Sequence, residues 1–231
     1  CTYDQTSVEW AVKLGAEGIK LNSADLSNPD VITAVSESGI PFTLGTGAST
    51  MGEIRKGLEM ASDCGAKDIV LMHGVQNFPT EITDLNIGRL SILQNEFSGI
   101  PVGYADHTAG NSSMASMIDL VALGFGPAVL EKHITLNRAN KGIDYQAALE
   151  PHELVDYVKR IRLGFEALGS FEIQPFTESD LKYRKFQKKS IVAAVDIKKG
   201  ELIDIDSIKF LRNSDPGLPP TELAQISGSV A

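Results

Sequence analysis

The chain has 231 residues, 42% of them hydrophobic, and a formal net charge of −9 at pH 7. This length suits one large domain, or one domain with a small appendage, and the negative charge argues against nucleic acid and anionic membranes as partners. No apolar run approaches the roughly 20 residues that span a bilayer, no secretory signal opens the chain, and two cysteines make no disulfide framework. We therefore expect a cytoplasmic protein.

Short apolar runs recur along the chain, each followed by a polar or small-residue loop and then by a helical pattern. The predicted strands are 18–21, 42–45, 69–72, 102–105 and 128–131. The predicted helices are 29–38, 50–65, 84–98, 111–124 and 151–168, with a further helix ahead of the first strand. This alternation predicts a parallel sheet with right-handed crossovers.

Two parallel architectures fit the alternation, a doubly wound sheet and a closed barrel. No G-x-G-x-x-G fingerprint follows a strand, which weakens the doubly wound alternative. Polar residues end nearly every strand, and a barrel places its active site on that face. The predicted fold is therefore an α/β protein of the (β/α)8 TIM-barrel type. Because only five units are visible, we expect about three strands upstream of Cys1.

The pattern changes after Gly169, which predicts a second domain. Residues 170–188 are polar and lack a clear period, as expected of a linker. Residues 190–194 and 208–211 are strand candidates, separated by a turn at 196–201. We thus predict a partial barrel over 1–169, a linker over 170–188 and the first part of a small β-rich domain over 189–231.

Two histidines at consecutive strand ends are the sharpest chemical signal. His107 follows Asp106, and His133 lies close after Glu131, so neighbouring barrel strands would bring both imidazoles to one rim. Neutral imidazole binds Mn²⁺, Zn²⁺ or Fe²⁺, and a nearby carboxylate can fix its tautomer. Either residue alone would more simply be a polar strand end, but the pair favours a metal site. Strand alternation points Lys132 away from its two neighbours.

Three other positions allow a functional and a structural interpretation. Lys20, inside an apolar strand, either extends outward or points into the barrel mouth to pair with a phosphate or carboxylate. The loop at 44–50 either caps the next helix or lets backbone N–H groups approach an anion. Asp144, in a long loop, either holds substrate hydroxyls or metal-bound water, or forms a turn. His73 is either a third ligand or part of the pocket wall.

A set of motifs spans nearly the whole chain, including Gly-Tyr-Ala-Asp-His-Thr at 103–108 and Glu-Lys-His at 131–133. Further motifs lie at 20–26, 45–47, 77–80, 142–144 and 149–151. Together they resemble the N-acetylneuraminate (sialic acid) synthases, including the synthases of other nonulosonic acids and the spore-coat polysaccharide branch. The stretch 190–201 resembles the opening of that family's antifreeze-like (SAF) domain.

The resemblance implies a transferase that condenses phosphoenolpyruvate with an N-acetylated hexosamine, of the N-acetylmannosamine type, giving a 2-keto-3-deoxy nonulosonic acid and phosphate. It implies a divalent metal, Mn²⁺ first and Mg²⁺ or Co²⁺ next, acting as a Lewis acid on the sugar aldehyde. It also implies a domain-swapped homodimer.

The resemblance assigns roles to individual residues. His107 and His133 match the metal ligands. The catalytic candidates are Glu131, Asp144 and Asp106. The substrate-binding candidates are Lys20 and Ser23 on the phosphoenolpyruvate side, together with Asp25, Thr46, Gln76, Phe78 and Arg212, the last reaching the sugar from the antifreeze-like domain of the other subunit.

The chain departs from the family pattern near the substrates. Gly45 replaces a serine, Gln76 and Phe78 replace a hydroxyl residue and a tyrosine, and Tyr145 replaces a histidine. These changes leave the sugar open. With strands expected upstream, we expect residues 1–231 alone to be inactive.

Two alternatives accompany the leading prediction. Another phosphoenolpyruvate-dependent keto-sugar-acid synthase is disfavoured by the antifreeze-like tail, because those enzymes end with the barrel. A non-catalytic sugar-binding homologue is disfavoured by the retained histidines, Lys20 and Asp144.

Overall fold

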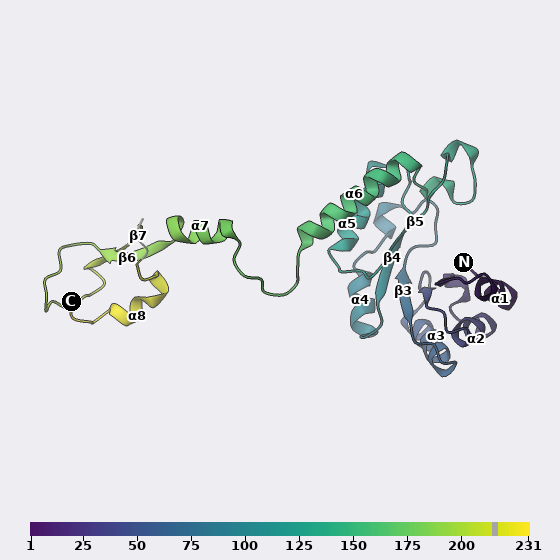
Figure 1. Ribbon diagram of the computed structural model, residues 1–231, viewed down its shortest axis with the longest axis horizontal. Coiled ribbons are helices and arrows are strands. Elements are labelled where there is room, and N and C mark those ends of the chain that lie inside the picture. Colours follow the sequence, from purple (N-terminus) through teal and green to yellow (C-terminus); the bar gives the residue numbers. More distant parts are fainter. Residues whose placement is uncertain (214–216) are drawn as a thin grey trace. The chain divides into compact units, whose positions relative to one another are not determined.

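The computed structural model describes residues 1–213 and 217–231, which form two compact units, Cys1–Gly169 and Ser170–Ala231 (Figure 1). The first unit holds a parallel sheet with its helices. The second holds a two-stranded antiparallel sheet. Among the described residues, no helix is long and apolar enough to cross a membrane.

The sheet of the first unit has five parallel strands in the order of the chain, which confirms the predicted fold class. They are β1 (Ile19–Leu21), β2 (Phe42–Gly45), β3 (Ile69–His73), β4 (Val102–Asp106) and β5 (Leu130–Lys132). The order never reverses, as it would in a doubly wound sheet.

An ion pair between the two outer strands shows that this sheet is curled. The Lys20 ammonium of β1 contacts the Glu131 carboxylate of β5. In a flat sheet these strands would lie about 19 Å apart, four spacings of 4.7–4.9 Å, which is beyond the reach of one lysine side chain. The edges of the sheet therefore bend toward each other, as in a barrel wall.

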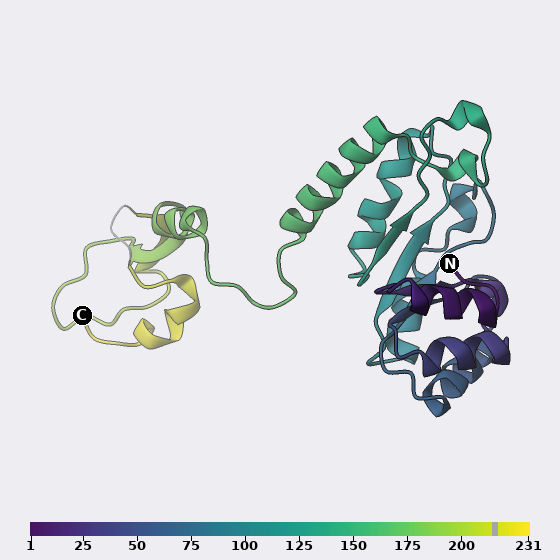
Figure 2. The ribbon, with the colours of Figure 1, turned by 45° about the vertical axis from the view of Figure 1, so that its right-hand side comes forward.

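Helices cover the outer side of the sheet (Figure 2). They are α1 (Gln5–Lys13), α2 (Pro29–Glu37), α3 (Met51–Asp63), α4 (Arg89–Glu96), α5 (Ile118–Leu123) and α6 (Pro151–Leu168). In the first unit, α1 packs against α2, α2 against α3, and α5 against α6. The core between sheet and helices includes the completely buried Leu21, Ile32, Leu44, Ile54, Leu71 and Leu90.

Two helices are shorter than the sequence predicts because other backbone structure takes their first turns. A 3₁₀ turn at Ile82–Asp84 and a positive φ of 44° at Asn86 delay the start of α4. Ahead of α5, the Ser112 side chain accepts a hydrogen bond from the Met114 N–H and favours a 3₁₀ turn at Ser113–Ser116. Serine competes in this way with the α-helical backbone. The remaining 3₁₀ turns are Ser23–Asp25, Arg138–Asn140, Tyr145–Ala147 and Pro220–Glu222.

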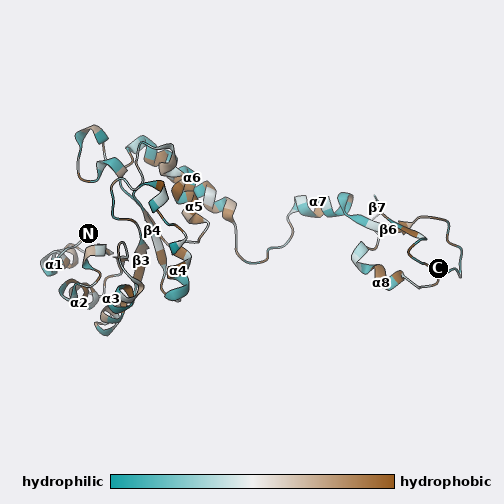
Figure 3. Ribbon diagram, turned by 180° about the vertical axis from the view of Figure 1, so that it is seen from behind, coloured by the Kyte–Doolittle hydropathy of each residue, from teal (hydrophilic) through white to brown (hydrophobic). Residues whose placement is uncertain are grey.

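The second unit contains α7 (Glu178–Gln187), β6 (Lys189–Ala193), β7 (Ile208–Arg212) and α8 (Leu223–Ile226). The two strands pair antiparallel, and both match predicted strands. The stretch expected as a linker, 170–188, contains α7, which is mostly hydrophilic (Figure 3). Its helical signal is the capping box of Thr177 and Asp180 rather than an apolar stripe.

Candidate active site

The carboxyl ends of the strands meet at one rim, as predicted, and surround a small cavity. The cavity has a volume of about 20 Å³, enough for one water molecule. Its lining includes Lys20, Ser23, Gly45, Gln76, His107 and Glu131, which come from all five strands or from the loops that follow them. The only β2 residue in this set is Gly45, and Ser23 fills the space beside it.

Lys20 points into the cavity, where its ammonium contacts the Glu131 carboxylate. The two side chains are 36% and 26% exposed, so water partly screens the pair. An ion pair of this kind is easily rearranged, since its net stabilisation is small. Lys20 is therefore available to an anionic ligand, and Glu131 lines the same cavity.

The two histidines lie side by side, with ring centroids 5.1 Å apart. Nδ1 of His107 is 2.6 Å from the Val75 carbonyl oxygen, which can only accept, so Nδ1 carries the proton and Nε2 is the free lone pair. Burial lowers the pKa of His107 below its usual 6.5. Burial also lowers the pKa of His133, although the charge of Asp144 opposes this shift. Both imidazoles are thus held neutral, the form that binds metals.

Phe78 packs against both imidazoles and covers one side of the pair. Its ring centroid lies 4.4 Å from that of His107 and 5.4 Å from that of His133. The Phe78–Pro79 bond is cis, and the Thr80 N–H donates to the His107 carbonyl over 2.8 Å. Phe78 therefore shields the histidines from water at the position where the family pattern has a tyrosine.

The donor set around the histidines fits a divalent metal that accepts imidazole. Within residues 1–213 and 217–231, no group of three or more histidine, cysteine, aspartate or glutamate side chains is placed to hold a metal. The neutral His107 and His133 imidazoles are thus the candidate ligands, and a metal held by them would need substrate or water to complete its shell. Two imidazoles suit Mn²⁺ or Co²⁺ better than Mg²⁺, which prefers oxygen.

Ser23 occupies the space beside Gly45. The Gly47 N–H donates to Ser23 Oγ over 3.0 Å. A Cβ at Gly45 would lie 2.5 Å from that Oγ and 2.6 Å from the Ser23 nitrogen. The missing hydroxyl at position 45 is thus sterically excluded, and the hydroxyl of Ser23 faces the cavity instead.

Two other expected substrate contacts do not line the cavity. Thr46 is completely buried, and its hydroxyl donates to the Met72 carbonyl over 3.2 Å. Asp25 is buried, and its carboxylate accepts from Asn28 Nδ2 over 3.1 Å. Both side chains support the loops around Ser23 and Gly47 rather than the cavity wall.

Asp106 points away from the cavity. In the register of β4 and β5, Ala105 pairs with Glu131 and faces the cavity, so Asp106 and Lys132 pair one position later and face the helices. There the Asp106 carboxylate accepts from Thr108 and Tyr104 and contacts the Lys132 ammonium. A catalytic role was expected of Asp106, but direct contact with a ligand in the cavity does not fit this placement.

Asp144 and Arg212 belong to different units. Asp144 has a left-handed backbone, φ 56°, and lies near enough to His133 for its charge to oppose the lowering of that residue's pKa by burial. Arg212 ends β7 in the second unit, with an exposed side chain. His73 is buried outside the cavity lining, where its Nε2–H donates to the carbonyls of Leu85 and Asn86, so it is neither part of the wall nor a third ligand.

A model of the NeuB family matches residues 1–173, and a model of the SAF domain matches residues 188–231. The chain belongs to the NeuB family, as the resemblance predicted, and carries an antifreeze-like domain after the barrel strands. This family match covers the whole cavity described above.

Named relatives agree with the family. An N,N'-diacetyllegionaminic acid synthase of Legionella pneumophila is 29% identical, over 98% of this chain and 63% of the relative. The N-acetylneuraminate-9-phosphate synthase of Homo sapiens is 28% identical, over 97% of this chain and 61% of the relative. The chain thus spans less than two thirds of the length of these relatives.

A solved structure agrees as well. The sialic acid synthetase of Leptospira borgpetersenii, in complex with citrate, superimposes with a TM-score of 0.71 and 27% identity, covering 79% of this chain and 62% of that one. A spore coat polysaccharide biosynthesis protein of Chromobacterium violaceum, at 22% identity and a TM-score of 0.77, supports the fold alone.

Proposed function

We propose that the protein is a nonulosonic acid synthase that condenses phosphoenolpyruvate with an N-acetylated hexosamine, releasing phosphate. The observation that carries the proposal is the meeting, at one rim, of a neutral histidine pair with the Lys20–Glu131 pair. One pair suits a metal and the other an anion, and this reaction needs both. The names of the relatives, which include sialic, legionaminic and pseudaminic acid synthases, support the same class.

On this proposal, Lys20 and Ser23 bind the phosphoenolpyruvate. The ammonium would neutralise negative charge on the anion, and the hydroxyl would donate to one of its oxygens. Such preorganised donors are worth most where charge develops during the reaction. Ser23 lines the cavity and fills the space beside Gly45, so its hydroxyl is the group at this position that can meet the anion.

The sugar would lie on the histidine side of the cavity. A divalent ion held by His107 and His133 would supply Lewis acidity to the aldehyde oxygen. Glu131 would hold or release a proton next to that oxygen, since it lines the cavity beside Lys20. Asp144 would bind sugar hydroxyls near His133, and Phe78 would exclude water from the imidazoles. The protein would act as a domain-swapped homodimer in the cytoplasm, in which Arg212 of one subunit reaches the sugar bound by the other.

The test uses full-length protein with Mn²⁺, phosphoenolpyruvate and a panel of N-acetylated hexoses, measuring phosphate and keto-acid product together. We expect product with at least one sugar, loss of activity on chelation, and recovery with Mn²⁺. His107→Ala, His133→Ala and Lys20→Ala should each lower kcat/KM by about 100-fold or more.

His152→Ala is the matched control, because this exposed histidine lies at the start of α6 and should leave activity unchanged. Absence of product with every sugar would favour a non-catalytic sugar-binding homologue. Product with a simple aldose phosphate instead of an N-acetylated sugar would favour another phosphoenolpyruvate-dependent keto-acid synthase.

A further inference from the structure

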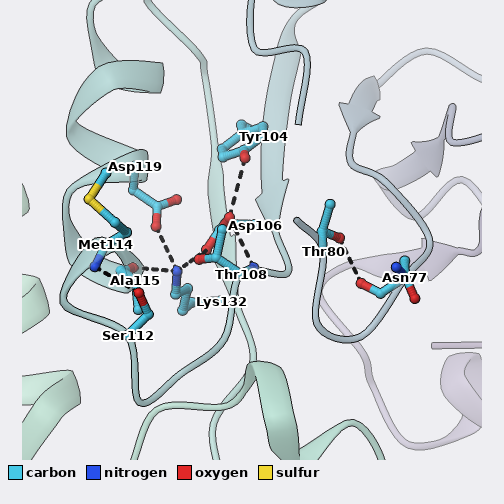
Figure 4. Close-up of polar contacts among 10 residues, drawn as sticks. All are labelled: Asn77, Thr80, Tyr104, Asp106, Thr108, Ser112, Met114, Ala115, Asp119 and Lys132. Atoms are coloured by element: carbon cyan, nitrogen blue, oxygen red, sulfur yellow. Dashed lines mark hydrogen bonds and ion pairs between the residues drawn. The ribbon is translucent and has the colours of Figure 1, made fainter. Parts of the chain in front are cut away.

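A buried cluster of charged side chains lies behind the two strand ends that carry the histidines, and the proposed reaction uses none of it directly. Figure 4 shows the Lys132 ammonium at its centre, with contacts to Asp106, Asp119 and the Ala115 carbonyl. Tyr157 of α6 packs beside it, with the ammonium 5.6 Å from its ring centroid. The cluster joins β4, β5, α5 and α6.

All three donors of the Lys132 ammonium have acceptors. It donates to Asp119 Oδ2 over 2.9 Å and to the Ala115 carbonyl over 2.5 Å, and it contacts Asp106 Oδ2. The Lys132 side chain is 4% exposed, and both aspartate side chains are completely buried. A lysine is almost never buried to this degree unless it is paired, so the cluster is a specific arrangement.

The cluster lies one residue from each imidazole. Asp106 and Lys132 are direct partners in the register of β4 and β5, and the next residue of each strand end is a histidine. Their ion pair therefore ties the two strand ends together where the backbone turns into His107 and His133.

Asp106 also holds the far side of His107. Its Oδ1 accepts from the Thr108 N–H over 3.2 Å, and its Oδ2 accepts from the Thr108 hydroxyl over 2.6 Å. The Asp106 carboxylate thus links the residues on either side of His107. Its ion pair with Lys132 fixes the position of this short segment relative to β5.

We propose that Lys132 is a positioning residue, which sets the separation and orientation of the His107 and His133 imidazoles through its tie to Asp106. Its bearing on a metal rests on the proposed function, whereas its bearing on the imidazoles does not. A lysine that only stabilised the fold would lower stability without changing how the imidazoles are held.

The experiment compares Lys132→Met with the double variant Asp106→Asn/Lys132→Met, which removes the tie and leaves Asp119 as the one carboxylate of the cluster. Val35→Ala is the matched control. Val35 is completely buried in α2, so its replacement should lower the free energy of unfolding without touching β4 or β5. Imidazole NMR spectra of the metal-free protein are the first readout, since the chain has four histidines. Mn²⁺ affinity, from the paramagnetic resonance of free Mn²⁺, is the second.

We expect the His107 and His133 resonances to shift or broaden in both Lys132 variants while those of the exposed His152 stay fixed. Mn²⁺ affinity should fall at least tenfold, as is typical when groups that orient metal ligands are removed. Val35→Ala should change neither readout at a comparable loss of stability. If Lys132→Met does not fold, the double variant gives the result.

A folded double variant with wild-type His107 and His133 resonances would overturn the proposal, and so would the same spectral change in Val35→Ala. Failure of the wild-type protein to bind Mn²⁺ would refute the proposed metal site instead. In that case the imidazole spectra still decide the positioning role.

Discussion

At position 45 a side chain has no room, because the backbone and hydroxyl of Ser23 lie where its Cβ would stand. Gly45→Ser, the change that would bring the chain closer to the family pattern, should therefore lower the free energy of unfolding by about 1–3 kcal/mol, as is usual for overpacking. Gly45→Ala should do the same, since the Cβ alone causes the conflict. Urea unfolding measures both.

Gly18→Ala is the control for this prediction. A Cβ at Gly18 meets only the Pro41 carbonyl oxygen, at an ordinary 3.7 Å. This variant should stay within about 0.5 kcal/mol of the wild type, as substitutions away from special features do. A Gly45→Ser protein as stable as Gly18→Ala would contradict the steric account.

His73 should make stability depend on pH. Burial lowers its pKa below the usual 6.5, and protonation would place a second N–H at Nδ1, which has no hydrogen-bond partner. The unfolded chain then binds more protons than the folded one as the pH falls below 6.5, so the stabilising contribution is complete above that pH and declines beneath it. His73→Gln should lose less stability than the wild type between pH 7 and pH 5, by chemical unfolding at each pH.

His152→Gln provides the comparison, because this histidine is exposed and should leave the pH dependence unchanged. An identical decline in the wild type and His73→Gln would show that another group controls this pH range. His107 and His133, whose pKa values burial also lowers, should contribute a further decline of the same sign.

Strand alternation predicts from sequence which face of the sheet some site residues occupy, but not others. Lys132 was assigned correctly to the far side of its strand, since its neighbours fix the phase. Asp106 lies on the same face of the sheet as Lys132, because the two residues are partners in the register of β4 and β5. That register cannot be read from the sequence alone. Asp119 could not be foreseen, because its role depends on how α5 packs behind β5.

Among the loops, the stretch that carries Asp144 is held by one arginine. Arg138 binds Glu153 of α6 with both terminal nitrogens, one of them at 2.6 Å, and its Nη1 also donates to the Ala148 carbonyl over 3.0 Å. Arg138→Lys keeps the charge but loses the two-pronged geometry. We expect faster hydrogen exchange across 137–147, by mass spectrometry, with a stability loss of only about 1 kcal/mol or less.

Arg55→Lys is the matched control for the loop. Arg55 pairs with Glu96 on the surface, and both side chains are well exposed. Its replacement should leave exchange across 137–147 unchanged. Equal exchange in wild type and Arg138→Lys would mean that the backbone contacts of this loop suffice to order it.

At the level of secondary structure, elements with an apolar period were predictable, and those stabilised locally were not. β1 to β4, α2 and α3 each bury two or more residues, and their positions agree with prediction to within two residues or so. α7 is exposed along its length and begins at a capping box. Such a helix gives no core signal, and its stretch therefore resembled a linker.

At the scale of the whole chain, the segment that opens the second unit should be the first site of proteolysis. Residues 170–177 have no regular structure, and the side chains of Phe171 and Phe176 are 79% and 58% exposed. Exposed segments of this kind are preferred sites of nicking. Brief chymotrypsin treatment of the folded protein should first cut after these residues, leaving the regions before 171 and after 176 intact by mass spectrometry.

Replacing both Phe171 and Phe176 by alanine is the control, since it removes the cleavage sites and should delay the first cut. A first cut inside Cys1–Gly169 would contradict the division into two units. The change of pattern after Gly169 was visible in the sequence because barrel periodicity stops there. The size of the sugar site could not be read in the same way, since it depends on side chains from strands distant in sequence.

The alternation at Glu131, Lys132 and His133 has a consequence for how this protein can change over time. Three adjacent codons serve two opposite environments, a wet cavity and a sealed charged cluster. Single substitutions alter one environment at a time, but gaining or losing one residue within β5 would exchange them, turning the ammonium toward the substrates and a carboxylate or imidazole toward Asp106 and Asp119. Insertions and deletions among such proteins should therefore fall in the loops on either side of β5, and not within residues 131–133.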